Sequence, residues 1–157
     1  MATKPMLYKG EEFNPDNYLP GEVQPVVQDP NMSESYVSWM QNPLDYNDLG
    51  KLSKNLAEAR RALSIVHSQM IEASSKVSKL ESDLNALRAA TSVNLSGGTV
   101  AEREAVITII TQGLMSQLTV WKVALQKVKN ESMLIKQDVD ILMALANNVR
   151  AEAKLAG

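Results

Sequence analysis

Apolar residues recur at alternating steps of three and four along the middle of the chain, and Lys, Glu, Ser, Arg and Asn fill most positions between them. This heptad pattern has one narrow apolar seam and predicts a helix of about 40 residues, roughly 60 Å long. Such a helix buries its seam only against a partner helix. The seam positions are Leu49, Leu52, Leu56, Ala59, Leu63, Val66, Met70, Ala73, Val77, Leu80, Leu84 and Leu87.

A second apolar seam follows and predicts a second long helix, over about residues 100–154. Its start is marked by Thr99 and Glu102, whose spacing is that of a capping box. Two successive steps of four predict a stutter near Gly113. The seam positions are Ile107, Ile110, Leu114, Leu118, Trp121, Leu125, Val128, Ser132, Ile135, Val139, Leu142, Ala146, Val149 and Ala153.

The turn between the two helices is predicted over residues 94–99, around the pair Gly97 and Gly98. Two long helices joined by a short glycine-rich turn pack antiparallel as a helical hairpin. The second helix also carries apolar residues off its seam, which a single hairpin leaves exposed, so we expect a homo-oligomer. These off-seam residues are Met115, Val120, Val123, Ala124, Leu134, Ile141, Met143 and Leu145.

Five of the six prolines lie in residues 1–32, and their spacing predicts an extended arm without a helix. A short helix is expected over residues 33–41, with Ser33 at its N-terminus, and Asp48 can cap the first long helix, expected over about 47–93. The predicted fold is therefore all-α. It consists of an extended arm (1–32) and a helical hairpin domain (33–157).

Charge is divided unevenly along the chain. Residues 1–50 hold eight acidic and two basic side chains, while the remainder holds ten acidic and fourteen basic ones. An acidic arm on a basic body indicates different partners for the two parts, or contact between them. No signal peptide or membrane-spanning run is expected, and the lack of cysteine excludes disulfides, thiolate metal sites and cysteine nucleophiles.

The sequence offers no arrangement typical of an active site. His67 is the only histidine, and its place on a long helix indicates a surface residue rather than a base or metal ligand. Asp138 and Asp140 face different sides of a helix, and no base accompanies the serines around Ser75. We therefore expect a protein without enzymatic activity, cofactor or metal.

Basic residues of the second helix recur at intervals of seven, seven and fourteen, which places them on one stripe. Such a stripe fits a track for the phosphates of a single-stranded nucleic acid. The alternative is an ordinary solvated face, which is favoured by the interspersed Glu131, Asp138 and Glu152. The candidate nucleic-acid-binding residues are Lys122, Lys129, Lys136, Arg150 and Lys154, with Arg60, Arg61, Lys76, Lys79 and Arg88 on the first helix.

Short motifs over residues 36–155 resemble small phage recombination mediators of the UvsY type. They are Tyr36-Val37-Ser38-Trp39, the run 99–104 (TVAERE), Trp121 and the run 146–152 (ANNVRAE). The resemblance implies a helical, ring-forming protein that binds single-stranded DNA through Lys and Arg. It also implies that the protein helps load a RecA-like recombinase onto strand coated by a single-strand-binding protein. The acidic arm and the net charge of −2 depart from the family pattern.

Two main hypotheses of function follow, and a generic coiled-coil interaction module is a third possibility. In the first, the chain is a non-enzymatic single-strand DNA-binding recombination mediator in the host cytoplasm. In the second, it is a virion structural or assembly protein, with the arm as a tether that contacts other virion proteins. Neither hypothesis involves a membrane.

Overall fold

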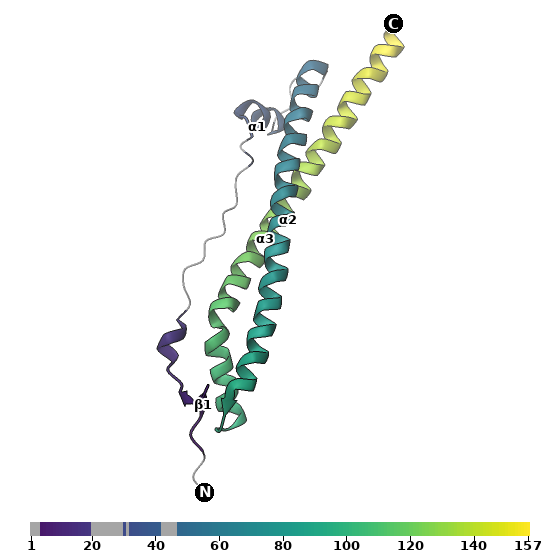
Figure 1. Ribbon diagram of the computed structural model, residues 1–157. Helices are drawn as coiled ribbons and strands as arrows, with labels where there is room; N and C mark the ends of the chain where they lie inside the picture. Colours follow the sequence, from purple (N-terminus) through teal and green to yellow (C-terminus); the bar gives the residue numbers. More distant parts are fainter. Residues whose placement is uncertain (1–3, 20–29, 31, 42–46) are drawn as a thin grey trace. The chain divides into compact units, whose positions relative to one another are not determined.

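The computed structural model describes residues 4–19, 30, 32–41 and 47–157, and structural statements below concern these residues (Figure 1). Two long helices, α2 (Leu49–Asn94) and α3 (Val100–Ala156), are joined by a short turn and form a helical hairpin. A short helix, α1 (Glu34–Gln41), precedes them. The all-α hairpin predicted from the heptad pattern is confirmed, and each helix begins and ends within two residues of its predicted bounds.

Each helix start predicted from the sequence carries its capping contact. The Thr99 amide donates to Oε2 of Glu102 at 2.6 Å, and the Glu102 amide donates to Oγ1 of Thr99 at 3.2 Å, which completes the capping box. The Asp48 carboxylate accepts from the amide of Lys51 at 3.1 Å and caps α2. Oγ of Ser33 accepts from the amide of Tyr36 at 3.1 Å and caps α1.

The predicted seams form the interface of the hairpin. On α2 every seam residue from Leu52 to Leu87 is buried or half-buried, and Leu49 in the first turn is exposed. On α3 the seam is buried or half-buried from Ile107 to Val149, and only the terminal Ala153 is exposed. α3 continues as a helix through Gly113, where the buried positions shift from Ile110 to Leu118.

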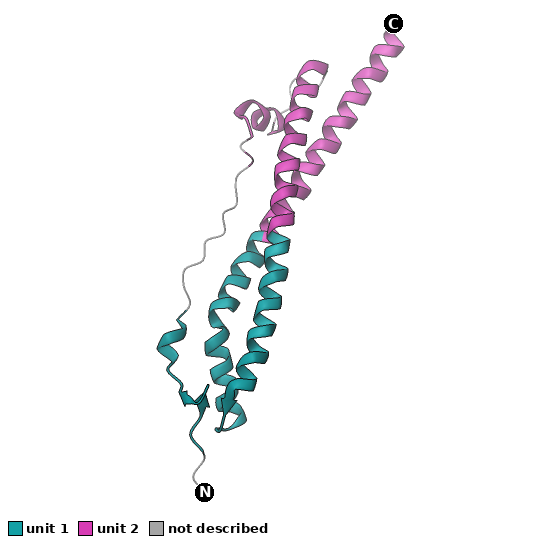
Figure 2. Cartoon of the chain, viewed as in Figure 1, with its two compact units in different colours: residues 1–26, 73–124 teal, residues 27–72, 125–157 magenta. Residues whose placement is uncertain are grey.

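The chain divides into two compact units (Figure 2). Unit 1 comprises Met1–Val26 and Ala73–Ala124, and unit 2 comprises Val27–Glu72 and Leu125–Gly157. Both long helices contribute to both units, and each unit is described by itself.

In unit 1 the start of the chain packs on the hairpin turn. Strands β1 (Leu7–Tyr8), β2 (Glu11–Glu12) and β3 (Leu95–Ser96) form an antiparallel sheet in the order β2-β1-β3. The Lys9 amide donates to the Asn94 carbonyl at 3.0 Å, so the N-terminal segment satisfies a carbonyl that the end of α2 leaves free. The rings of Tyr8, Phe13 and Tyr18 contact one another and pack on a core of Leu95, Val106 and Ile110.

Residues 4–19 therefore differ from the extended arm expected for 1–32. A 3₁₀ helix (η1) forms at Pro15–Tyr18, although the proline spacing predicted no helix. The reason is that a proline at the first helical position lacks only an amide that the helix leaves unbonded, while Asn14 accepts from the amide of Asp16 at 3.0 Å. The rest of the predicted arm, except residues 30 and 32, lies outside the described residues.

In unit 2, α1 packs across α2 and α3. Tyr36 and Trp39 are buried against Leu52 and Ala59 of α2 and Leu142 of α3. The small side chain of Ala59, which is fully buried in the same cluster, leaves room for these rings. Oγ of Ser33 also donates to Oε2 of Glu58 at 2.8 Å, and the hydroxyl of Tyr36 donates to Oδ2 of Asp138 at 2.9 Å. Each long helix thus supplies one carboxylate that holds α1.

Candidate nucleic-acid interface

Three of the predicted basic residues lie along one flank of the α3 seam in unit 2. Lys129, Lys136 and Arg150 each follow directly after a seam residue, and all three are exposed. The heptad spacing places neighbours on this row about 10.5 Å apart along the helix. Met143 occupies the missing position of the row. Burial of the seam therefore fixes the direction in which these three basic side chains project.

Residues of α2 meet the same flank of α3 from across the seam. In unit 2, Nη2 of Arg60 lies 3.7 Å from Sδ of Met143. Because the two helices are antiparallel, one heptad after Arg60 on α2 and one heptad before Met143 on α3 lead to His67 and Lys136. His67 is exposed, as the sequence indicated.

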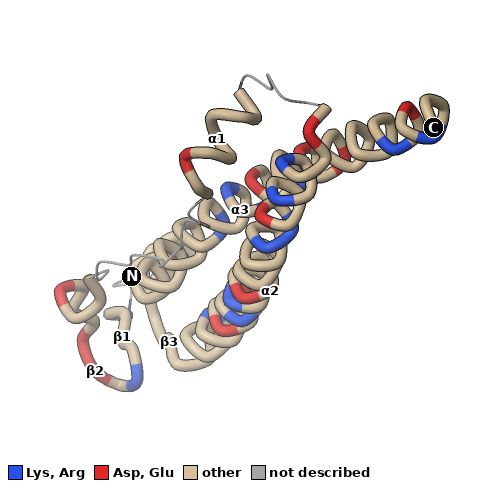
Figure 3. The backbone as a smooth tube through the Cα atoms, turned by 90° about the horizontal axis from the view of Figure 1, so that it is seen from above, with Lys and Arg blue, Asp and Glu red and all other residues tan. Residues whose placement is uncertain are grey.

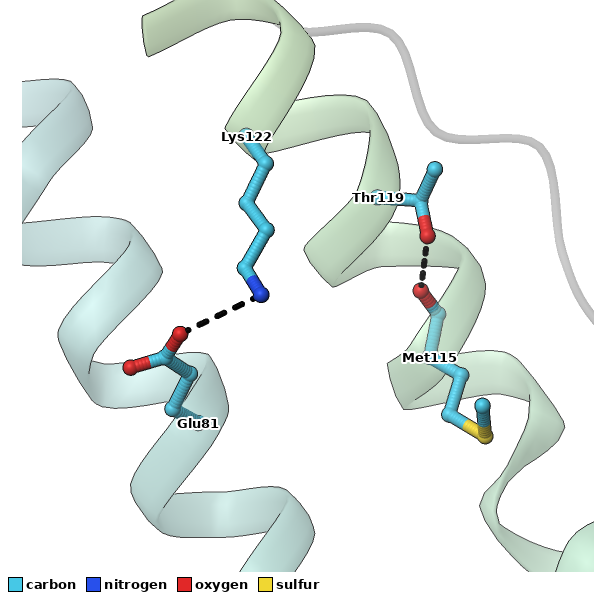
Figure 4. Close-up of polar contacts among 4 residues, drawn as sticks. All are labelled: Glu81, Met115, Thr119 and Lys122. Atoms are coloured by element: carbon cyan, nitrogen blue, oxygen red, sulfur yellow. Dashed lines mark hydrogen bonds and ion pairs between the residues drawn. The ribbon is translucent and has the colours of Figure 1, made fainter.

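In unit 1, two basic residues each contact a side chain of the opposite helix of the hairpin. Nζ of Lys122 lies 3.4 Å from Oε1 of Glu81 (Figure 4), and Nη2 of Arg88 lies 3.7 Å from Sδ of Met115. Both side chains of the Lys122–Glu81 pair are about half exposed. Lys122 belongs to the predicted stripe by spacing, but its charge is already partly neutralised.

The opposite flank of the hairpin in unit 2 is covered. Asn55 and Ala62 of α2 are buried there, and Met32 packs against Ala62 and its neighbours. On α3, Asp138 accepts from the hydroxyl of Tyr36, which is buried at 3% exposure. Burial, the hydrogen bond to Asp138 and the negative charges of Asp138 and Glu58 raise the pKa of Tyr36 well above its ordinary value. Within the described part of the chain, Met32 and α1 therefore cover this flank, while Lys129 and Lys136 on the other flank are exposed.

The heptad geometry also separates acidic from basic residues on α3. Glu131, Asp138 and Glu152 lie at intervals of seven and fourteen, on the flank that includes the bond to Tyr36. The sequence indicated that these carboxylates interrupt the basic stripe, whereas the register places them on the other side of the seam. Asp140 is the acidic residue of α3 that remains near the basic row. Figure 3 shows the Lys and Arg positions along both long helices.

The other predicted residues do not join the row. Arg61 is exposed on α2 and, as the neighbour of Arg60, projects away from the seam. Lys154 is exposed in the last turn of α3, beyond Arg150. In unit 1, Lys76 is half-buried and Lys79 is exposed, and neither shares a heptad position with Arg88. The structure thus groups Arg60, Lys129, Lys136 and Arg150, and leaves the other candidates apart from them.

Among the described residues, Lys129, Lys136 and Arg150 have no carboxylate within ion-pair distance. Within that same part of the chain, no three His, Cys, Asp or Glu side chains converge as a metal site would require. No described helix is long and apolar enough to cross a membrane.

Comparisons with known proteins return no match. No protein-family model matches the chain, and neither the curated proteins nor the solved structures give a significant similarity. The resemblance to recombination mediators stays a prediction from the sequence.

Proposed function

We propose that the protein is a non-enzymatic accessory factor that binds single-stranded DNA along the basic flank of unit 2, in the manner of a phage recombination mediator. One observation carries this proposal. The exposed cations Lys129, Lys136 and Arg150 lie on one flank of the α3 seam, whereas Asp138 lies on the other flank, where it accepts a hydrogen bond from Tyr36 of α1. The net charge of −2 conceals a locally basic surface.

The chemistry of the row suits a flexible phosphate backbone. Lys129 and Lys136 are point charges on mobile stems, and Arg150 adds a planar donor that can bind one phosphate through two N–H groups. Met143 occupies the uncharged position between Lys136 and Arg150, and the guanidinium of Arg60 on α2 contacts the Met143 sulfur. A single row of cations can follow one strand, and its binding energy comes from counterion release without base-specific contacts.

The partners of such a factor would be a RecA-like recombinase and a single-strand-binding protein. This part of the proposal rests on the resemblance of the motifs quoted above. The basic flank supports only the contact with nucleic acid.

A second candidate function is a virion structural or assembly protein. It is favoured by apolar side chains of α3 that project from unit 2, among them Leu134 at 59% exposure and Ile141 at 51%. Such residues are typical of a surface that contacts another protein. A chain that binds no single strand at low salt would favour this candidate.

The salt dependence of DNA binding tests the first proposal. The triple variant Lys129→Gln, Lys136→Gln and Arg150→Gln should flatten the log–log slope of affinity against salt by about two, since each contact with a single strand releases about 0.7 counterion. Fluorescence anisotropy with a labelled oligonucleotide at several salt concentrations measures this slope. Thermal stability should change little, because exposed charges contribute only about 0–1 kcal/mol each.

Two variants provide matched controls. Lys122→Gln removes a cation of the same spacing that is paired with Glu81, and Lys54→Gln removes an exposed cation of α2 outside the predicted set. Each should leave the slope nearly unchanged. If Lys122→Gln and Lys129→Gln flattened the salt slope equally, a binding site in unit 2 would be contradicted. If the unmodified chain showed no affinity for a single strand at about 50 mM salt, DNA binding would be rejected.

A further inference from the structure

A second heptad seam lies on the exposed side of α3 in unit 2. Starting at Leu134, the steps of three and four lead to Leu155 without meeting a charged residue. The apolar members are Leu134, Ile141, Ala144, Ala151 and Leu155, and all of them are exposed. The remaining two members, Gln137 and Asn148, are exposed and uncharged. Three heptads of this kind are the signature of a two-stranded coiled coil rather than of a solvated face.

This seam is distinct from the surfaces already described. The hairpin interface uses residues such as Val139 and Leu142, and α1 packs beside them on the flank of Asp138. Neither covers Leu134 or Ile141, which are 59% and 51% exposed. The basic row is also separate, because Lys136 lies two positions after Leu134 and so on another side of the helix.

We propose that this seam pairs with the same seam of a second copy of the chain, as a parallel and in-register coiled coil. In this arrangement Asn148 faces Asn148 of the other copy, and the two side-chain amides can donate to and accept from each other. A polar Asn at one core position fixes the register of parallel dimers in this way. Ala144 and Ala151 allow the two helices to approach closely. This inference does not depend on DNA binding.

The charges beside the seam favour the parallel orientation. Flanking residues of one helix face residues five positions further on in its parallel partner, so Asp140 would face Leu145 and Asn147 would face Glu152. No like charges meet. In an antiparallel pair, Leu134 of one helix would be opposite Ala151 of the other. Glu131 would then face Glu152 at both ends of the pair, and like charges in such positions are destabilising. Parallel pairing also gives Leu155 an apolar partner.

Cysteine crosslinking of the full chain tests both partner and orientation, since the natural sequence contains no cysteine. Ala151 lies in the seam and would face itself across the dimer, within the geometry that a disulfide allows. Ala151→Cys should therefore form a covalent dimer under mild oxidation. Ala153→Cys is the matched control, because Ala153 is exposed on the same helix but lies off this seam.

Light scattering completes the test. At about 100 µM the unmodified chain should have twice the chain mass, and Ile141→Lys should weaken pairing roughly 100-fold because a charge would enter the seam. Its helical circular dichroism should stay unchanged, since Ile141 is exposed within the hairpin. The salt slope of DNA binding should also persist in Ile141→Lys, which separates this inference from the proposed function.

Three results would overturn the proposal. One is a monomer mass at about 100 µM, which would show that the seam does not pair with a second copy of the chain. Another is equal crosslinking of the variants at Ala151 and Ala153. The last is crosslinking of Ala151→Cys only in mixtures with a Leu134→Cys chain, which is the signature of antiparallel pairing.

Discussion

The hydroxyl of Tyr36 holds α1 on the hairpin of unit 2 through Asp138, and Tyr36→Phe should measure its contribution. The donor is buried at 3% exposure, and the acceptor at 2.9 Å is a half-buried carboxylate. Hydrogen bonds to charged groups contribute about 1.5–3 kcal/mol, and water can reach Asp138 in part, so we expect a loss of about 1–2 kcal/mol. Phenylalanine keeps the packing of the ring.

The background of Asp138→Ala should reverse the sign of this effect. Without its acceptor the buried hydroxyl is unsatisfied, so Tyr36→Phe should then be neutral or stabilising by up to about 1 kcal/mol. Urea unfolding of the four proteins, followed by the fluorescence of Trp39 and Trp121, measures this double-mutant cycle. Tyr8→Phe is the matched control, because no described residue bonds to the Tyr8 hydroxyl. An equal cost in both backgrounds would refute the proposed role of Asp138.

The same contact predicts a pH dependence. The pKa of Tyr36 is raised in the folded protein above its unfolded value of 10.0. The stabilisation of the folded protein by the Tyr36 hydroxyl is therefore complete below pH 10. It is lost as the pH rises toward the folded pKa, because the tyrosine of the unfolded chain is deprotonated first. Between pH 9 and 11 the advantage of the natural chain over Tyr36→Phe should shrink by about 1.4 kcal/mol. A constant difference over that range would show that the tyrosine pKa is not raised.

Two further predictions concern unit 1. Thr91→Val should raise stability by about 1 kcal/mol in urea unfolding, because the Thr91 hydroxyl is fully buried without a hydrogen-bond partner. Thr111→Val is its control and should not stabilise, since that hydroxyl donates to the Ile107 carbonyl at 2.8 Å. Gly97→Ala should destabilise by about 1–3 kcal/mol, because Gly97 has φ +75 and an added Cβ would strike the Pro5 carbonyl. The same urea titration measures the loss, and an unchanged midpoint would contradict the close approach.

The sequence by itself determined the hairpin. The heptad seams from Leu52 to Leu87 and from Ile107 to Val149 give each helix one buried side, and the capping box at Thr99 sets where α3 begins. These features are local, because period, caps and glycine turn are readable from neighbouring residues alone. The basic row was likewise predictable, since heptad spacing fixes which residues share a side.

Only the tertiary structure decided which side of the seam is available. Spacing alone could not show that α1 covers the flank of Asp138, because Tyr36 and Asp138 are far apart in the sequence. It also could not show that Lys122 is paired with Glu81 while Lys129 is free of carboxylates, since this depends on the register between the helices. The strand pairing of residues 7–8 with 95–96 was unforeseen for the same reason. Long-range contacts depend on which surfaces remain after the helices pair, and local patterns do not encode that choice.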